Sequence, residues 1–170
     1  MNDESMTVEL RELAGGRLHP FGEPLDPAIP LVAAGCYTIW DDDARFVYAG
    51  MAGRSLTAEG IEAAGSRSPA RVTGLRDRLG SHRSGRRSGD QFCVYVFDRL
   101  VLPSLTNEQI SAAAAGRLRL DDEVRRFVRE HLAYRWVATA DGRAAFRLEA
   151  ALVTEGINGE LPLLNPRVVA

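Results

Sequence analysis

The chain has 170 residues, of which 45% are apolar and 26% charged, values that fit one globular domain with a hydrophobic core. No apolar run approaches the roughly 20 residues of a membrane span, and the acidic start MNDESMTVELREL lacks the apolar core of a secretory signal. The formal net charge of −2 hides an uneven distribution, because all 21 basic residues are Arg and residues 1–31 carry six acids against two arginines. A cytoplasmic protein with no membrane partner is the simplest prediction.

A β-hairpin is predicted directly after an N-terminal extension of residues 1–33. Its strands are the apolar, aromatic and β-branched runs 34–40 and 45–51, which flank the acidic turn DDDA. The strands carry two mirrored triplets, Gly35-Cys36-Tyr37 and Tyr48-Ala49-Gly50. Glycine weakens a strand, so these positions are easier to explain if another backbone or a ligand approaches closely, although both tyrosines could be ordinary sheet aromatics.

Residues 52–73 are rich in Gly, Ala and Ser and predict an excursion with at most a short helix. Thr73 is then expected to cap a helix over about 74–83, whose two leucines point inward. Arg78 and His82 lie four residues apart on one side of this leucine stripe and are expected at the boundary between core and solvent. For this pair alone, a structural Arg and a half-buried His are the simpler interpretation.

A basic stripe runs through the same region. It could meet phosphates, but an Arg-rich coding bias and a solvated loop are the simpler explanation from charge alone. The seven arginines of residues 65–90 are Arg67, Arg71, Arg76, Arg78, Arg83, Arg86 and Arg87.

The second half of the chain predicts alternating strands and helices. The first elements are a strand over 91–102 and a helix over 106–116, with Thr106 as its cap and Gly116 as its stop. A second helix over 121–132 has an inward stripe of Val124, Phe127, Val128 and Leu132. A strand over 134–140, a tight turn at Asp141-Gly142 and a final helix over about 143–155 follow. Short strands mixed with helices on their faces indicate an α+β domain. The two distant cysteines, Cys36 and Cys93, are expected to be reduced core thiols.

The final helix carries a carboxylate in an unexpected place. At helical spacing, Glu149 falls within the apolar arc that runs from Leu148 and Leu152 to Phe146. An unpaired carboxylate there costs several kcal/mol, so it should be protonated, paired with an arginine or bound to a metal. A buried ion pair and a metal ligand both remain open on this evidence.

Taken together, these residues resemble the GIY-YIG nuclease superfamily, and an insertion before the Arg helix is similar to its restriction-endonuclease branch. Five elements occur in the family's order across about residues 34–90 and 134–166. They are GCY at the GIY triplet, YAG at the YIG triplet, LRDRLGSH with Arg78 and His82 at the Arg helix, RLEAALV with Glu149 at the acidic helix, and LPLLN with Asn165 at the closing motif.

The resemblance implies a single domain over 34–166 with a three-stranded mixed or antiparallel sheet flanked by helices. Insertions would interrupt it at about 52–73 and at 103–133, the second being helical. It also implies a divalent-metal-dependent endonuclease that hydrolyses DNA phosphodiester bonds, in restriction or defence, in a mobile element or in repair. Double-stranded DNA is the expected partner, and a homodimer is a further expectation because cutting two strands needs two sites.

The family pattern assigns the charged roles to two residues. Glu149 would hold one Mg²⁺ or Mn²⁺, which explains an acid in an apolar arc, and Arg78 would clamp the phosphoryl oxygens. Many members carry Lys directly after the second triplet, where this chain has Met51, and Arg54 is the candidate replacement cation. The arginines expected to contact DNA are Arg54, Arg67, Arg71, Arg76, Arg83, Arg86 and Arg87.

The remaining roles concern proton transfer and support. Tyr37 would be the general base on the attacking water, which requires its pKa to be lowered from about 10. Tyr48 would position the water or the phosphate, His82 would relay a proton or orient a neighbour, and Asn165 would brace the site. The glycines of the triplets would let the scissile phosphate come close.

Two other functions compete with nuclease activity. A catalytically silent GIY-YIG scaffold could bind DNA or a protein, an interpretation that Met51 and the acidic overall charge favour. Alternatively, the Val124 stripe of the helical insertion could bind a partner helix, although ordinary core packing explains that stripe more simply.

Overall fold

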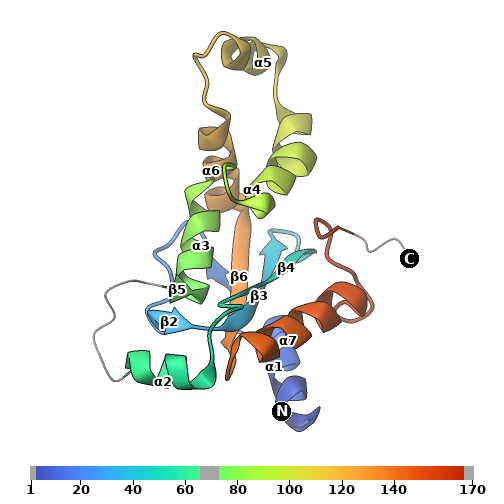
Figure 1. The fold of residues 1–170 in the computed structure, drawn as a ribbon. Helices are drawn as coiled ribbons and strands as arrows, with labels where there is room; N and C mark the ends of the chain where they lie inside the picture. The colour runs from blue at the N-terminus through green and yellow to red at the C-terminus, as the bar shows by residue number, and fades with distance from the viewer. Residues whose placement is uncertain (1–2, 66–72, 167–170) are drawn as a thin grey trace.

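The computed structural model describes residues 3–65 and 73–166 and shows an α+β fold (Figure 1). In chain order its elements are α1 (Asp3–Gly15), β1 (His19–Pro20), β2 (Val32–Ala33), β3 (Gly35–Asp41), β4 (Phe46–Ala52), α2 (Ala58–Gly65), β5 (Thr73–Gly74), α3 (Leu75–Ser84), α4 (Gln91–Val96), a π-helical turn η1 (Phe97–Val101), a 3₁₀ turn η2 (Leu102–Ser104), α5 (Asn107–Ala114), α6 (Leu120–His131), β6 (Leu132–Ala138) and α7 (Gly142–Thr154). Within the described ranges no helix is long and apolar enough to cross a bilayer.

The central sheet is antiparallel and has the strand order β1-β6-β3-β4. The predicted hairpin is β3–β4, and its register places Tyr37 opposite Gly50 and Ile39 opposite Tyr48, with an irregularity before Trp40. The predicted three-stranded sheet gains a fourth strand, β1, from the N-terminal extension. A separate parallel pair joins β2 to β5. Strand β4 therefore lies at the edge of the central sheet, beside the helices that carry the motif residues.

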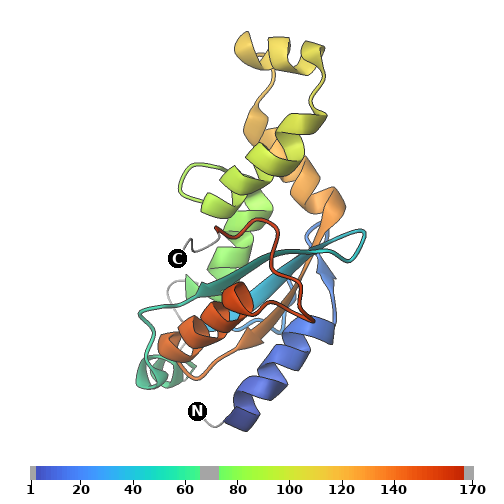
Figure 2. The same ribbon diagram turned by 90° about the vertical axis from the view of Figure 1, so that its right-hand side faces the viewer.

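Helices cover both faces of the sheet because each face is apolar (Figure 2). Successive strand residues point to opposite sides, so Tyr37 belongs to one buried cluster and Cys36 to the other. The Tyr37 face packs against α3, α4 and α6, whereas the Cys36 face packs against α1 and α7. Cys36 and Cys93 are both buried free thiols, as predicted. The sheet edge is thus the place where residues from both layers can meet.

The predicted strand over 91–102 is wrong, because this segment is helical. Asp90 caps α4 by accepting the backbone N–H of Cys93, and Phe92, Cys93 and Val96 are buried at helical spacing. The apolar, β-branched run favoured a strand on composition, but the cap and packing of a helix against the sheet decide the structure. The chain then continues through η1 and η2.

The start of α3 also differs from the prediction. Thr73 lies in β5, and the residue before the helix is Gly74, which has φ 92° and makes no side-chain cap. A Cβ on Gly74 would overlap the backbone of Ala33, so the β2–β5 pairing requires glycine there. The tight contact between the two short strands sets where α3 begins.

The N-terminal extension contributes to the core. Helix α1 packs against β6 and β3, Leu13 is fully buried, and the Thr38 hydroxyl donates to the Leu13 carbonyl at 2.8 Å. Helix α1 was not predicted from the sequence. Its sequence is rich in acids and has few apolar residues, so the stripe that packs on the sheet is narrow.

The helical insertion forms an arm, with α5 at the end farthest from the sheet (Figure 1). Thr106 caps α5 as predicted and forms a complete capping box with Gln109. In α6, Val124 and Val128 are buried in the core and Phe127 packs beside them. The apolar stripe of α6 therefore anchors the arm to the domain.

Candidate functional site

A cleft of about 330 Å³ opens beside edge strand β4. Five of the six predicted catalytic residues line it, from four separate elements. They are Tyr37 and Tyr48 from the hairpin, Arg78 and His82 from α3, and Glu149 from α7. The lining also includes Met51, Arg54, Asp90, Gln91 and Phe92. Residues distant in sequence thus share one depression.

One wall of the cleft is a buried hydrogen-bonded chain. The Tyr37 hydroxyl lies 2.8 Å from Nε2 of His82, and Nδ1 of His82 lies 2.7 Å from a carboxylate oxygen of Asp90. These three side chains are at most 2% exposed. The same Asp90 oxygen accepts the Ser81 hydroxyl at 2.9 Å, and its other oxygen accepts the Cys93 amide. Asp90 therefore both caps α4 and orients His82.

Burial and hydrogen bonds together determine the protonation states along this chain. Burial raises the pKa of Tyr37 well above its ordinary value, so the phenol keeps its proton. Burial also lowers the pKa of His82, against the opposing effect of Asp90, and leaves the imidazole neutral. For Asp90, burial raises the pKa, but hydrogen bonds from His82, Ser81 and the Cys93 amide outweigh it and keep the carboxylate ionised.

These states determine the His82 tautomer. Ionised Asp90 can only accept, so Nδ1 of His82 carries the hydrogen and donates it. Nε2 then has a free lone pair that accepts the Tyr37 hydroxyl hydrogen. The nearby cation Arg78 lowers the pKa of Tyr37, but burial raises it by more. The phenol is instead coupled to a neutral base.

Asp90 lines the cleft but was not predicted as a site residue from the sequence. A signal was present, since Asp90 immediately precedes a segment with Phe92, Cys93 and Val96 at helical spacing, a pattern typical of a helix cap. The strand predicted over 91–102 hid that signal. His82, expected at the boundary between core and solvent, is 1% exposed because it contacts both Tyr37 and Asp90.

The triplet glycines make room for protein atoms. A Cβ on Gly50 would overlap the Tyr37 hydroxyl and the Tyr48 ring, and one on Gly35 would overlap the Val137 carbonyl and the Leu75 side chain. At Gly35 this is the close approach of another backbone, one of the two alternatives predicted from the sequence. Gly50 instead lets the two tyrosine rings approach to 6.4 Å between centroids.

Glu149 reaches the cleft from the opposite layer. Its Oε1 accepts the Met51 N–H of the edge strand at 3.1 Å, and its other oxygen has no hydrogen-bond partner among the described residues. Burial raises the pKa of Glu149, while the Met51 amide, Arg54 and Arg78 oppose that rise. The carboxylate lies at the edge of the buried arc, since Phe146, predicted to lie within it, is 43% exposed.

Asn165 supports the hairpin from outside the cleft. Its side-chain oxygen accepts the Ala49 N–H at 2.8 Å, and its side-chain nitrogen donates to the Ala49 carbonyl at 2.9 Å. The amides of Leu163 and Leu164 add backbone bonds to the same strand. The closing segment therefore pairs with the free edge of β4, which is the bracing position expected for Asn165.

The predicted DNA-contacting arginines are divided between internal and exposed positions. Arg76 donates to the carbonyls of Asp26 and Ile29, Arg83 to those of Phe21 and Glu23, and Arg87 pairs with Asp121 at 2.8 Å. Arg54 and Arg86 are exposed, and Arg67 and Arg71 lie outside the described residues. Several arginines of the basic stripe therefore hold α3 to the N-terminal extension and to α6.

The two arginines that line the cleft form no hydrogen bond or ion pair with the described residues. Arg78 is exposed and makes no hydrogen bond or ion pair to any described residue. Arg54 stacks on the Phe146 ring at 4.6 Å and lines the cleft beside Met51. That position is compatible with Arg54 as the cation in place of the family's Lys.

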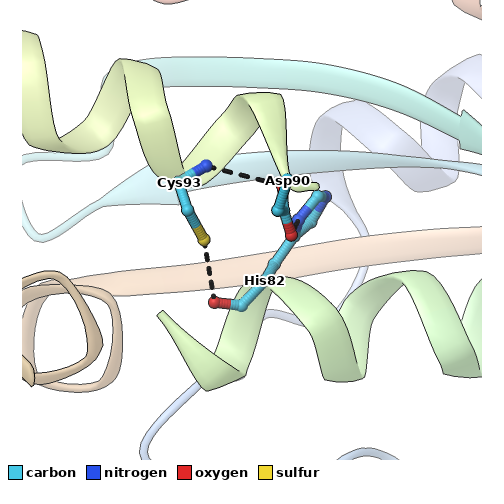
Figure 3. A group of neighbouring side chains, drawn as sticks. All are labelled: His82, Asp90 and Cys93. Carbon is cyan, nitrogen blue, oxygen red and sulfur yellow. Dashed lines mark hydrogen bonds and ion pairs between the residues drawn. The ribbon is translucent and has the colours of Figure 1, made fainter. Parts of the chain in front are cut away.

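The first candidate metal site is a buried cluster of three side chains. His82, Asp90 and Cys93 bring three ligand atoms within 4.8 Å of one another (Figure 3), but the histidine and carboxylate bond each other and the thiol contacts the His82 carbonyl at 3.6 Å. Burial also raises the Cys93 thiol pKa, which opposes the thiolate that a metal needs. This cluster is therefore complete as a hydrogen-bonded unit.

Glu149 has the donor chemistry of a magnesium ligand. Mg²⁺ binds through one or two carboxylates and keeps several waters. One carboxylate oxygen of Glu149 is free of bonds to described residues and borders an open cleft. This arrangement fits a hydrated divalent ion better than the closed His82 cluster does.

Comparisons with protein-family models, curated protein sequences and solved structures find no match for this chain.

Proposed function

We propose that this chain is a divalent-metal-dependent endonuclease that hydrolyses DNA phosphodiester bonds, in the manner of the GIY-YIG nucleases it resembles. The observation that supports this most strongly is the convergence of Tyr37, Tyr48, Arg78, His82 and Glu149 on one cleft. Phosphodiester hydrolysis needs a base for water, cations for the phosphoryl charge and stabilisation of the leaving oxygen. The cleft contains residues suited to each task.

The base in this proposal is the Tyr37–His82–Asp90 chain. A water molecule gives a proton to the Tyr37 oxygen while the phenol passes its own hydrogen to Nε2 of His82, 2.8 Å away. The resulting imidazolium is stabilised by the Asp90 carboxylate, 2.7 Å from Nδ1. No free phenolate forms, so the raised pKa of Tyr37 does not prevent the transfer.

The opposite side of the cleft stabilises the negative charge of the phosphoryl group in this proposal. The Arg78 guanidinium is free to donate to two phosphoryl oxygens, a geometry that arginine suits better than lysine. Tyr48, half-buried beside the His82 ring, orients the water or the phosphate through its hydroxyl. A divalent ion held by Glu149 would supply Lewis-acid stabilisation to the phosphoryl group and the leaving 3′ oxygen.

The test is incubation of the purified chain with supercoiled plasmid in Mg²⁺, Mn²⁺ or EDTA. Nicked and linear products are expected with either metal and not with EDTA, and the new ends should carry 5′-phosphate and 3′-hydroxyl groups. Cleavage in EDTA, or cleavage that persists after Glu149→Ala, would contradict the proposal.

The second candidate is a silent scaffold that binds DNA or a protein. Met51 favours it, because this side chain lines the cleft where a cation is common in the family. A Mn²⁺ titration separates the two, since a nuclease should bind the ion through Glu149 and a scaffold need not. Gel filtration with and without DNA tests the accompanying expectation of a homodimer.

A further inference from the structure

A second depression, of about 350 Å³, lies beside the cleft and is lined by a concentrated set of arginines. Arg143 and Arg147 project into it from α7, together with Phe146, and Arg54 borders both this depression and the cleft. We name Arg54, Arg143, Phe146 and Arg147 the α7 arginine surface. None of the described residues that line the depression is acidic.

Within the described part of the chain, two arginines of this surface lack the hydrogen-bond partners that arginines of α3 have. Arg143 and Arg147 are exposed and make no hydrogen bond or ion pair to any described residue. Arg76 and Arg83, in contrast, use their guanidinium groups on backbone carbonyls. Free guanidinium groups of this kind remain available to an anion.

The surface is positioned by backbone contacts. The Gly142 N–H at the start of α7 donates to the Leu56 carbonyl at 2.9 Å, and a Cβ on Gly142 would overlap the backbone of Gly53 and Arg54. This contact fixes the loop that carries Arg54 against α7. Stacking on Phe146 then holds the Arg54 guanidinium 4.6 Å from the ring centre.

The positions of Arg143 and Arg147 destabilise helix α7. Arg143 and Arg147 are like charges four residues apart, and Arg143 is the second residue of α7, where the helix dipole disfavours a cation. A negatively charged ligand would relieve both effects. The charge pattern is therefore better suited to a bound polyanion than to an isolated helix.

We propose that the α7 arginine surface binds the phosphates of a DNA strand next to the phosphate held in the cleft. This proposal rests on the proposed function, because the cleft supplies the position of the scissile phosphate. Helix α7 presents Glu149 to the cleft and Arg143 and Arg147 to the adjoining depression, so one helix couples strand binding to the metal-binding carboxylate. The DNA strand would pass from the cleft to the second depression over Arg54, which borders both.

The test is fluorescence anisotropy of a labelled DNA duplex with the full chain in EDTA, over a series of salt concentrations. The variant is Arg143→Ala/Arg147→Ala. The matched control is Arg11→Ala/Arg117→Ala, which removes two exposed arginines, one on α1 and one just after α5 at the end of the arm. Thermal unfolding checks that both double variants are folded.

Loss of two phosphate contacts should lower the slope of log K against log salt by about 1.8, at ~0.9 for each contact with duplex DNA. The control should keep the wild-type slope. Equal slopes for all three proteins, equal losses in both double variants, or no DNA binding by the wild type would each overturn the proposal. Inorganic phosphate that displaces the duplex at the same phosphate concentration would also overturn it, because it would indicate a simple anion site.

Binding and cleavage can fail separately. If the wild type binds DNA through these arginines but never cleaves it with metal, the α7 arginine surface stands and the nuclease proposal fails. If the wild type cleaves DNA and the α7 variant keeps the wild-type salt slope, the nuclease proposal stands and the surface fails.

Discussion

The two sides of the cleft differ in how completely their polar groups are satisfied. On the Tyr37 side, the phenol, the imidazole of His82 and the carboxylate of Asp90 are buried and bonded to one another. On the Glu149 side, one carboxylate oxygen and the Arg78 guanidinium have no hydrogen-bond partner among the described residues. Buried polar groups must be paired, whereas accessible ones are hydrated by solvent until a ligand binds.

This difference separates two chemical tasks. The buried side has one tautomer and one protonation state, which suits a proton acceptor whose geometry must not change. The open side carries free charges of both signs, which suits a phosphate and a divalent ion. Substitutions on the buried side should therefore alter proton transfer, and those on the open side should alter the stabilisation of charge.

Replacing Tyr37 by Phe should have the largest effect among the variants that leave Glu149 in place. In the proposed mechanism it removes the group that takes the proton from water, so the single-turnover cleavage rate should fall by about 10² to 10⁴. It also leaves Nε2 of buried His82 unpaired, which should cost about 1–3 kcal/mol of unfolding free energy. Tyr95→Phe, on a half-buried tyrosine of α4, is the control. A Tyr37→Phe rate within a few-fold of wild type would remove this residue from the proton path.

Arg78 and Arg76 offer a matched pair on α3. Arg78→Ala should lower the cleavage rate by about 10² to 10³ with little change in stability, because its side chain is free and lines the cleft. Arg76→Ala should lower the unfolding free energy by about 1–3 kcal/mol and spare the rate, because its guanidinium holds the carbonyls of Asp26 and Ile29. Denaturant unfolding and single-turnover cleavage rates test both variants. A destabilised Arg78→Ala protein with a normal rate, or a stable Arg76→Ala protein with a slow rate, would contradict these two roles.

Asp90→Asn should reduce the rate by about 10² by changing the His82 tautomer. The amide oxygen would keep the Cys93 N–H, which leaves the amide NH₂ to donate to Nδ1 of His82 and moves the imidazole hydrogen to Nε2. The α4 cap would survive, so the far-ultraviolet circular dichroism should not change. Asp90→Ala would remove the cap as well, and comparison of the two variants separates orientation from folding.

The pH dependence follows from the direction of the His82 shift. Its pKa is lowered, so the neutral acceptor should persist below the ordinary value of about 6.5, and the acid limb of kcat/KM should lie below that pH. The unfolded chain takes up this proton first as the pH falls, so the unfolding free energy should decline below about pH 6.5. A kcat/KM limb above pH 7 would contradict a buried neutral His82.

The sequence predicted the parts of the site that depend on local pattern. The hairpin followed from two β-branched, aromatic runs around an acidic turn, and α7 followed from apolar residues at helical spacing. These two elements carry Tyr37, Tyr48 and Glu149, so much of the cleft was predicted. The order of the motifs placed Arg78 and His82 on α3.

The features that the sequence did not predict depend on distant contacts. The partners of Arg76 and Arg83 are carbonyls about 50 to 60 residues away, and nothing in the local pattern marks them. The segment from Gln91 to Val96 has strand-like composition but gains more by packing as a capped helix. The role of Asp90 was hidden by that misassignment, since its position as a helix cap also sets its contact with His82.

The most direct test compares Glu149→Gln with Glu155→Gln in Mg²⁺-dependent plasmid cleavage. Both variants remove one carboxylate from α7 or its end, but Glu149 borders the cleft and Glu155 is exposed at the C-terminal cap. If Glu149 holds the metal as proposed, its loss should remove several kcal/mol of transition-state stabilisation, a rate decrease of about 10³ or more, whereas Glu155→Gln should cleave at the wild-type rate. Equal rates for the two variants would contradict an active site built around Glu149.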